Sequence, residues 1–329
     1  MRGVVHVWLG WLLAAGVSAL APSLGAAQGV VIDSSAAAQV ELGRRLFYDA
    51  DLSINGTMAC ATCHEQRHAF SDGNATHPGA LDDPGKRNVP GLANVGRLHN
   101  LTWANDRLPG LEAQALNPIL GDDPIEMGMK RKQGEIARRL YLNACDVKLF
   151  AVAFPDSGGT IDMASITAAL AAFERTMISF ETPYDWSVRW RSALASEAAA
   201  KGETMFERAG CVACHPPPLF TDDAFHHVET SRHKTADAGL MLVTGRTEDQ
   251  GVFRTPSLRN IALTAPYWHD GHARTLADAI REHDLPCTTA GPLSDADIAQ
   301  IAAFLETLTD RGFVTDKRFA YPDDACPVQ

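Results

Sequence analysis

The sequence has few basic residues, few aromatic residues and little cysteine. Its 329 residues hold 29 Lys and Arg against 40 Asp and Glu, a formal net charge of -11. Because a polyanion binds to a basic surface, this balance argues against nucleic acid as a partner. Seven cysteines are too few for a disulfide-rich scaffold, and their number is odd. With 46% hydrophobic residues, the composition excludes a disordered, collagen-like or polytopic membrane protein.

Residues 1–27 have the pattern of a secretory signal peptide. Arg2 is their only formal charge, an apolar run covers 4–20, and the small residues 25–27 provide a cleavage site. The alternative is an uncleaved membrane anchor, but the run is shorter than the roughly 20 residues that a span needs. Cleavage near Ala27 would leave a chain without a membrane span, with charge -12, in the periplasm.

The periodicity of the sequence predicts a mainly α-helical fold. No stretch alternates apolar and polar residues as a strand does, whereas several follow the helical period of 3.6. Loops at 71–100 and 216–260 have no periodicity, and loops of that length usually enclose a functional object. The predicted helices cover 36–47, after Ser35, then 161–180 and 196–209, about 8 residues after Thr275 and about 14 after Ser294.

Two C-x-x-C-H motifs carry the clearest chemical signal. They are Cys60-Ala-Thr-Cys63-His64 and Cys211-Val-Ala-Cys214-His215. Two thiols three residues apart on a helical turn reach the two vinyl groups of one porphyrin, and the next residue places an imidazole under the iron. The alternatives are a zinc site or a dithiol redox pair, and neither explains a histidine after each cysteine pair. The sequence therefore predicts two covalently bound c-type haems.

The motif spacing suggests a duplicated architecture. Cys60 and Cys211 lie 151 positions apart, and a chain of this length has room for two domains. We expect two c-type cytochrome-like domains with long loops, each holding one covalent haem. The N-terminal haem domain would cover 28–185 and the C-terminal haem domain 186–329, with the boundary near 182–196.

Around these motifs the sequence resembles the bacterial di-haem cytochrome c peroxidase and MauG superfamily, and within it the MbnH-type enzymes. The resemblance covers nearly the whole chain after residue 27. It rests on the two haem motifs and on Glu41-Leu-Gly-Arg-Arg-Leu-Phe-Tyr48, Ala69-Phe-Ser-Asp-Gly73, Arg87-Asn88-Val-Pro90, Leu101-Thr-Trp-Ala-Asn105, Leu111-Glu-Ala-Gln-Ala-Leu116, Ile125-Glu-Met-Gly128, Ala172-Phe-Glu-Arg-Thr176, Phe220-Thr-Asp222, Phe253-Arg-Thr-Pro-Ser-Leu-Arg-Asn260, Ala262-Leu-Thr-Ala-Pro-Tyr-Trp-His-Asp-Gly271 and the ending 308–319.

The resemblance implies that the first haem has an open distal face where peroxide reacts. Glu126 matches the family's distal acid, which moves the peroxide proton. Gln114 and Pro118 match a hydrogen-bond partner and a packing wall of the same pocket. Trp103 matches the tryptophan between the haems, which relays an electron or shares a hole. By residue type alone, Glu126 would be a solvated carboxylate and Trp103 a core residue.

The second haem's distal ligand distinguishes the branches of the superfamily. At the position 14 residues beyond His269, where peroxidases place Met and MauG-like proteins Tyr, this chain has His283. His283 shares a helix face with Leu276, Ala279 and Ile280, so it is either a haem ligand or a core histidine. Asn88, with the carbonyls of Thr264 and Pro266, matches the family's calcium site between the haems, and oxygen ligands suit that hard cation.

The remaining cysteines, histidines and tryptophans have weaker claims. Cys287 and Cys326 are the expected disulfide, with Cys145 buried on its helix, although connectivity cannot be derived from sequence. His77 lies in a loop where some peroxidases carry a displaceable ligand, at an unusual offset, so a surface position is the stronger reading. Core or surface positions are likewise expected for Trp186, Trp190 and Trp268, and ligation has no argument at His226, His227, His233 and His272.

These features predict a periplasmic di-haem oxidoreductase. It would react with hydrogen peroxide, form a high-valent bis-haem state and oxidise a residue, by preference tryptophan, of a protein partner such as an MbnP-like copper-binding protein. One alternative is a cytochrome c peroxidase reduced by a small redox protein; a strongly acidic donor would be disfavoured by the chain's own charge. The other is a non-enzymatic electron carrier, against which Glu126 speaks.

Overall fold

The computed structural model describes residues 34–227, 236–283, 292–322 and 325–328, and these are mainly α-helical. The signal peptide predicted for 1–27 lies outside them. None of the described helices has the length and apolar character needed to cross a membrane. The helices and strands are α1 (Ser35–Phe47), α2 (Cys60–Cys63), α3 (Leu111–Leu120), α4 (Gln133–Leu140), α5 (Ala144–Ala153), α6 (Met163–Glu174), α7 (Pro183–Trp190), α8 (Glu197–Arg208), β1 (Phe225–His227), α9 (Met241–Thr244), β2 (Val252–Arg254), α10 (Leu276–Glu282) and α11 (Asp295–Glu306).

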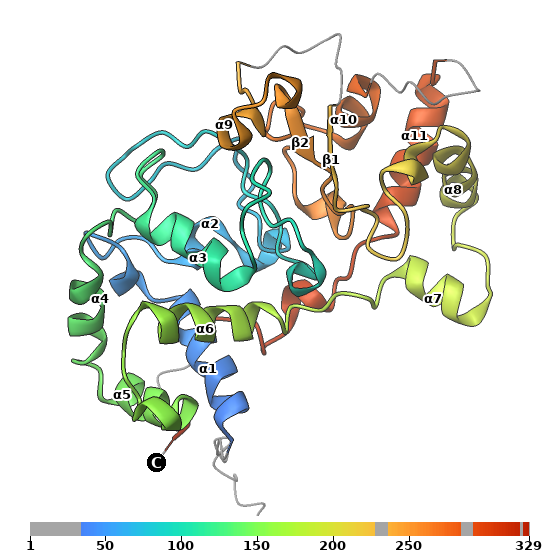
Figure 1. The fold of residues 1–329 in the computed structure, drawn as a ribbon. Helices are drawn as coiled ribbons and strands as arrows, with labels where there is room; N and C mark the ends of the chain where they lie inside the picture. Colours follow the sequence, from blue (N-terminus) through green and yellow to red (C-terminus); the bar gives the residue numbers. More distant parts are fainter. Residues whose placement is uncertain (1–33, 228–235, 284–291, 323–324, 329) are drawn as a thin grey trace, which may run out of the picture.

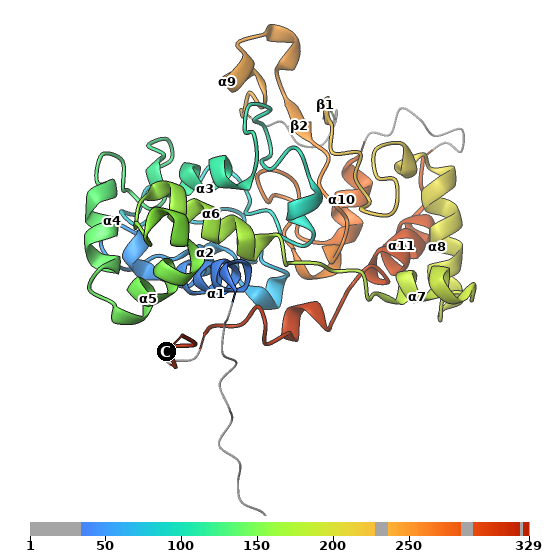
Figure 2. The ribbon, with the colours of Figure 1, turned by 60° about the horizontal axis from the view of Figure 1, so that its bottom comes forward.

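The helices form two lobes, which lie side by side in Figures 1 and 2. The first lobe contains α1 to α6, and the second contains α7 to α11 together with the β1–β2 ribbon. Each lobe has its own cluster of buried apolar side chains. The ribbon is antiparallel, pairs Phe225 with Arg254, and lies inside the loop predicted over 216–260. The described strands are confined to this ribbon, so the predicted helical fold class is confirmed.

The main helix pair of the first lobe crosses at a glycine. Helix α1 packs along α6. A Cβ atom at Gly43 would lie 1.9 Å from the carbonyl oxygen of Ala169 and 2.9 Å from the Cβ of Phe173. The absence of a side chain therefore lets the two backbones approach closely. Helix α1 begins after Ser34, whose hydroxyl accepts from the backbone N–H of Ala37, one residue earlier than the sequence predicts.

The second lobe repeats this crossing with α8 and α11. A Cβ atom at Gly202 would lie 1.9 Å from the carbonyl oxygen of Gln300 and 2.9 Å from the Cβ of Phe304. Ser196 caps α8, and Gly210 follows it with φ +79°, which confirms the predicted start and end of this helix. In both lobes a C-x-x-C-H motif follows the first helix of the crossing pair.

One predicted helix, 161–180, is too long. The structure ends α6 at Glu174. Beyond it the chain turns away to reach a buried loop: the carbonyl of Met177 accepts from the backbone N–H of Asn94, and the backbone N–H of Ser179 donates to the Asn94 side chain. Tertiary hydrogen bonds therefore override an apolar pattern that would otherwise continue the helix.

A buried polar network joins the two lobes. The Asn260 side chain donates to the Ser179 hydroxyl at 2.9 Å and accepts from the backbone N–H of Asp310 at 2.8 Å. The Ser179 hydroxyl donates in turn to the Asp310 carboxylate at 3.2 Å. All three side chains are buried. Because a buried polar group that loses its partner is costly, this network holds the lobes in one arrangement.

The chain after Asp310 returns to the first lobe, as the red segment of Figure 2 shows. Phe313 and Phe319 pack into the same apolar cluster as α1 and α6. The Tyr48 hydroxyl donates to the carbonyl of Phe319 at 2.7 Å, and Arg44 donates to that of Ala320 at 3.0 Å. The last residues of the chain thus belong to the core of the N-terminal lobe.

This return path changes the predicted disulfide. Cys326 is bonded to Cys145 of α5, with their Cα atoms 5.6 Å apart. The expected pairing of Cys326 with Cys287 is therefore wrong, and Cys287 lies outside the described residues. The sequence places Cys145 and Cys326 181 positions apart, and only the C-terminal segment folding back under α5 brings them together.

Candidate haem sites

The first haem motif forms a single helical turn. Helix α2 carries both Cys60 and Cys63, and His64 ends it. The Nδ1 atom of His64 lies 2.6 Å from the carbonyl oxygen of Phe70. That hydrogen bond uses one ring nitrogen as a donor and leaves Nε2 as a lone-pair ligand. Burial lowers the pKa of His64, which favours the neutral imidazole.

The second motif has the same hydrogen-bond geometry. Cys211 lies in a 3-10 turn that follows Gly210, and the Nδ1 atom of His215 lies 3.0 Å from the carbonyl oxygen of Phe220. Burial, with a smaller contribution from the nearby His283, lowers the pKa of His215 to about 4. The neutral ring again presents Nε2 as a ligand.

A cavity of about 1300 Å³ lies in front of His215. It is larger than the roughly 1,000 Å³ at the upper end of sites for drug-sized molecules. His283 directly follows α10, and its Nδ1 atom lies 2.7 Å from the carbonyl oxygen of Ala279. The predicted face of Leu276, Ala279, Ile280 and His283 does line this cavity. Two imidazoles with their Nδ1 atoms occupied thus face the same space.

Within the described part of the chain, two buried donors of the cavity wall have no hydrogen-bond partner. They are Nη1 of Arg254 and Nε1 of Trp268. The Arg254 side chain is 4% exposed, and its nearest carboxylate, that of Asp223, is 3.8 Å away. Unpaired buried donors are rare in native proteins. A c-type haem would supply carboxylates to such donors and take its thioether bonds from Cys211 and Cys214, so the residues fit this cofactor.

Facing the first motif is the carboxylate of Glu126. Glu126 is an exposed residue, yet the burial of its carboxylate raises its pKa, and the charge of His77 opposes that shift. Glu126 is also one of the charges that act on the Cys63 thiol. Gln114 and Pro118 lie one turn apart on α3, and the carbonyl of Pro118 accepts from the backbone N–H of Met127, next to Glu126. The structure therefore brings these predicted residues together.

Trp103 lies between the two lobes. Its Nε1 donates to the carbonyl of Asn88 at 2.8 Å, while its own carbonyl accepts from the backbone N–H of Arg254. The indole also lines the cavity in front of His215. A bidentate ion pair between Arg87, which precedes Asn88, and Asp237 is a further link between the two halves of the chain, with distances of 2.7 and 2.8 Å. Trp103 is thus fixed by contacts from both halves of the chain.

The three residues expected at a calcium ion, Asn88, Thr264 and Pro266, all line the same cavity. The Asn88 amide nitrogen donates to the carbonyl of Asn74 at 2.9 Å, which directs the amide oxygen away from that loop. Asn88 itself is buried. Their placement on one wall is compatible with a shared cation, and calcium stays a prediction.

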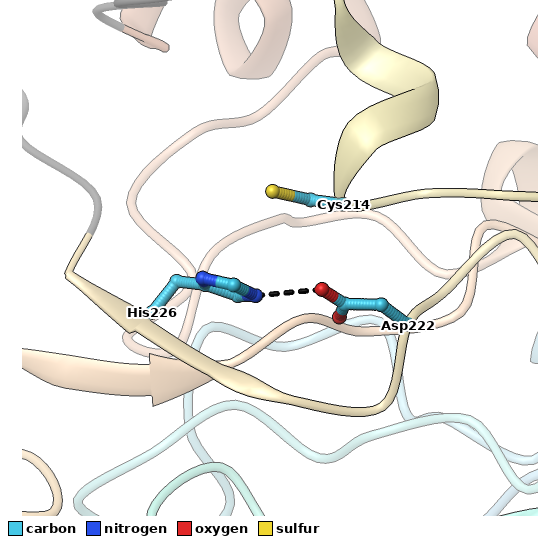
Figure 3. A group of neighbouring side chains, drawn as sticks. All are labelled: Cys214, Asp222 and His226. Carbon is cyan, nitrogen blue, oxygen red and sulfur yellow. Dashed lines mark hydrogen bonds and ion pairs between the residues drawn. The ribbon is translucent and has the colours of Figure 1, made fainter.

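Cys214, Asp222 and His226 form a second group with metal-ligating atoms, shown in Figure 3. Asp222 and His226 are joined by a 2.6 Å contact between Oδ2 and Nε2. In a haem-bearing protein the Cys214 sulfur is a thioether, which leaves too few ligands for a tetrahedral zinc site. We therefore interpret the group as a carboxylate–histidine pair beside the haem attachment.

Several residues of these sites were missed from the sequence. Arg254 lies within the Phe253-Arg-Thr-Pro motif, so motif membership was the available signal. His77, expected at the surface, lies close enough for its charge to act on both His64 and Glu126. Trp268 lies within the motif 262–271, so motif membership was again the signal, but its place beside His283 depends on the turn that carries it.

Comparison with known proteins gives one family match around each haem-attachment motif. The family model for di-haem cytochrome c peroxidase matches residues 37–192, and the model for cytochrome c matches 199–309. The methylamine utilization protein MauG of Methylorubrum extorquens is 34% identical, over 82% of this chain and 78% of the relative. Cytochrome c551 peroxidase of Nitrosomonas europaea is 32% identical, over 82% and 79%.

A solved structure agrees with these relatives. The crystal structure of a MauG-like protein associated with microbial copper homeostasis superposes with a TM-score of 0.79 and 36% identity, covering 87% of this chain and 93% of that one. The likeness in fold extends over both lobes, and in this chain each lobe carries one haem-attachment motif. This chain is therefore a di-haem oxidoreductase that belongs to the di-haem cytochrome c peroxidase and MauG family.

Proposed function

We propose that this chain is a periplasmic enzyme that reacts with hydrogen peroxide at its first haem and oxidises a tryptophan of a protein partner. The observation that carries the proposal is the pair His215 and His283, whose side chains line one cavity. Ligation by two histidines gives a lower potential than ligation by histidine and methionine. A low-potential second haem suits the sharing of an oxidising equivalent better than the uptake of electrons from a small cytochrome.

When bound, the haems supply the iron that reduces peroxide and holds the oxidising equivalents. The chain's own residues prepare that reaction. Glu126, with its raised pKa, accepts or returns the peroxide proton, and Gln114 offers a hydrogen bond in the same pocket. Trp103, held from both lobes, is the relay between the two haem sites. The four motif cysteines and three histidines hold the cofactors.

The partner is proposed to be a copper-binding protein of the periplasm, because a structural relative is described as associated with copper homeostasis. A calcium ion at Asn88, Thr264 and Pro266 would stabilise the junction beside Trp103. Metal analysis of the purified protein tests that ion: one equivalent of calcium, lost on chelation together with a change in the haem spectra, is expected. A protein without calcium, or spectra indifferent to its removal, would refute it.

The second candidate is a cytochrome c peroxidase, which the similarity to the Nitrosomonas europaea enzyme favours. One experiment separates the two. Stoichiometric peroxide added to the oxidised holoprotein should produce a long-lived near-infrared absorption band, whose lifetime shortens in Trp103→Phe. Rapid oxidation of a reduced small cytochrome without such a band would support the peroxidase instead. A Trp186→Phe variant, altered at an exposed helix position, is the matched control.

A further inference from the structure

Trp268 occupies a position that the proposed function leaves unused. It lies between two imidazole rings: its ring centroid is 4.7 Å from that of His283, with an interplanar angle of 36°, and 5.6 Å from that of His272, with an angle of 26°. The indole and both imidazoles line the cavity in front of His215. The contact with His283 places Trp268 beside the distal side of the second haem site.

The backbone conformation at Trp268 is unusual for a large residue, which indicates that the contacts of its side chain matter at this position. The residue has φ +72°, a conformation that bulky residues rarely adopt and that glycine adopts readily. The turn is closed by hydrogen bonds from the backbone N–H of Tyr267 to the carbonyl of Ala273 and from that of Gly271 to the carbonyl of Trp268. Strained positions of this kind persist where the surroundings determine them, often at functional sites.

A clasp of charged side chains fixes this turn against the end of α10. His272 contacts the Asp270 carboxylate through Nδ1 and the Glu282 carboxylate through Nε2, each at 2.5 Å. Glu282 is the last residue of α10 and directly precedes His283. The clasp therefore fixes the position of Trp268 relative to His283.

The indole N–H of Trp268 is a second notable feature of this position. Nε1 of Trp268 is buried and has no hydrogen-bond partner among the residues that the structure describes. A buried N–H donor without a partner carries a desolvation penalty, so a ligand atom is expected to accept its hydrogen bond. The Nε2 atoms of His215 and His283 are reserved for the iron and a thioether sulfur is only a weak acceptor, whereas a carboxylate at the edge of a porphyrin is a strong one.

We propose that Trp268 is a positioning residue of the second haem: its indole face packs against the His283 imidazole and orients it, and its Nε1–H donates a hydrogen bond to a haem propionate. The inference rests on the second-haem part of the proposed function, the assignment of a haem between His215 and His283, and not on peroxide chemistry. Trp268 touches the cofactor and its ligand and takes no part in bond breaking.

Two variants of the holoprotein separate the two contacts. Trp268→Phe keeps a ring against His283 and removes the N–H, so we expect a downward shift in the reduction potential of the second haem and a shifted propionate bending mode in resonance Raman spectra. The potential falls because the propionate charge is less compensated. Trp268→Leu removes the ring as well, and should also broaden the low-spin EPR signal because the His283 ring loses its fixed orientation.

Trp186→Phe is the control, since Trp186 is exposed and donates to Glu181 at 2.9 Å. It should leave potential, Raman and EPR spectra unchanged. A fully haem-loaded Trp268→Phe protein with wild-type potential and Raman modes would overturn the inference, even where Trp268→Leu fails to bind haem. His283→Ala separates the two levels: unchanged low-spin EPR there refutes the cavity assignment, whereas a change there combined with a silent Trp268→Phe refutes only the role of Trp268.

Discussion

The two haem-binding lobes share a backbone arrangement but differ in the side chains at their sites. In each, two helices cross at a glycine, a C-x-x-C-H motif follows, and the motif histidine donates through Nδ1 to a carbonyl five or six residues later. Facing the second motif is the imidazole of His283, whereas Glu126 faces the first. A repeated scaffold thus presents two imidazoles at one site and an imidazole with a carboxylic acid at the other.

The helices behind the motifs differ in the same sense. Leu305 follows Phe304 in α11 and lines the second cavity. The residue that follows Phe173 at the equivalent crossing of α6 is Glu174, which is buried, and burial raises its pKa to about 8. Its charge also acts on Cys60. The second lobe therefore has an apolar side chain at the position where the first lobe holds a titratable group.

Removing one haem at a time tests the difference between the two lobes most directly. Cys60→Ala with Cys63→Ala, or Cys211→Ala with Cys214→Ala, should each lower the covalent haem content from two to one, measured by the pyridine haemochrome assay. Without thioether bonds the corresponding haem is not retained. Only the variant that keeps the first haem should still respond optically to peroxide, and the reverse result would exchange the roles of the lobes.

The acid at the first site gives the next largest effect. Glu126→Gln should slow the reaction with peroxide by about 10²–10⁴-fold, because the proton loses its acceptor. Since burial raises the pKa of Glu126, the wild-type rate should rise with pH as the carboxylate ionises through that raised pKa. Stopped-flow mixing across pH measures both. Glu197→Gln, at an exposed position of α8, should keep the wild-type rate, and a pH-dependent Glu126→Gln enzyme would contradict the assignment.

Glu174 should make the stability of the folded protein depend on pH. Its folded pKa of about 8 lies above the usual carboxyl value of 4.5, so the folded state binds a proton that the unfolded chain releases. The contribution of Glu174 to the free energy of unfolding is fully present below pH 4.5. It is lost as pH rises toward 8, by a few kcal/mol in all, at about 1.4 kcal/mol per pH unit. In Glu174→Gln this slope should disappear from urea unfolding of the holoprotein. An unchanged slope would place the proton on another group.

The smallest effect tests whether the two helix crossings are equivalent. Gly43→Ala and Gly202→Ala each place a Cβ atom 1.9 Å from a carbonyl oxygen, so each should lower the free energy of unfolding by about 1–3 kcal/mol. Gly134→Ala is the matched control: it lies in α4 with open space around it and should be neutral or stabilising. A tolerated Gly202→Ala beside a damaging Gly43→Ala would show that only the first crossing is tight.

The local chemistry could be predicted from sequence because it depends on spacing within a few residues. The C-x-x-C-H motifs, the capping residues Ser196 and Thr275, and the shared face of Leu276 and His283 all follow from helical geometry. The resemblance to a family supplied the candidates farther apart, such as Glu126 and Trp103. The end of α6 was predicted wrongly because its apolar pattern continues where tertiary hydrogen bonds turn the chain away.

By itself the sequence determined the fold class, the two haem attachments and the candidate ligands, since each is encoded by short-range periodicity or by a motif. Only the tertiary structure decided that Cys326 pairs with Cys145, that the C-terminal segment completes the first lobe, and that Trp268 lies against His283. These contacts join residues that lie far apart in the sequence or on opposite sides of a turn. Their partners are selected by packing and hydrogen bonding in the folded protein, and no local pattern records them.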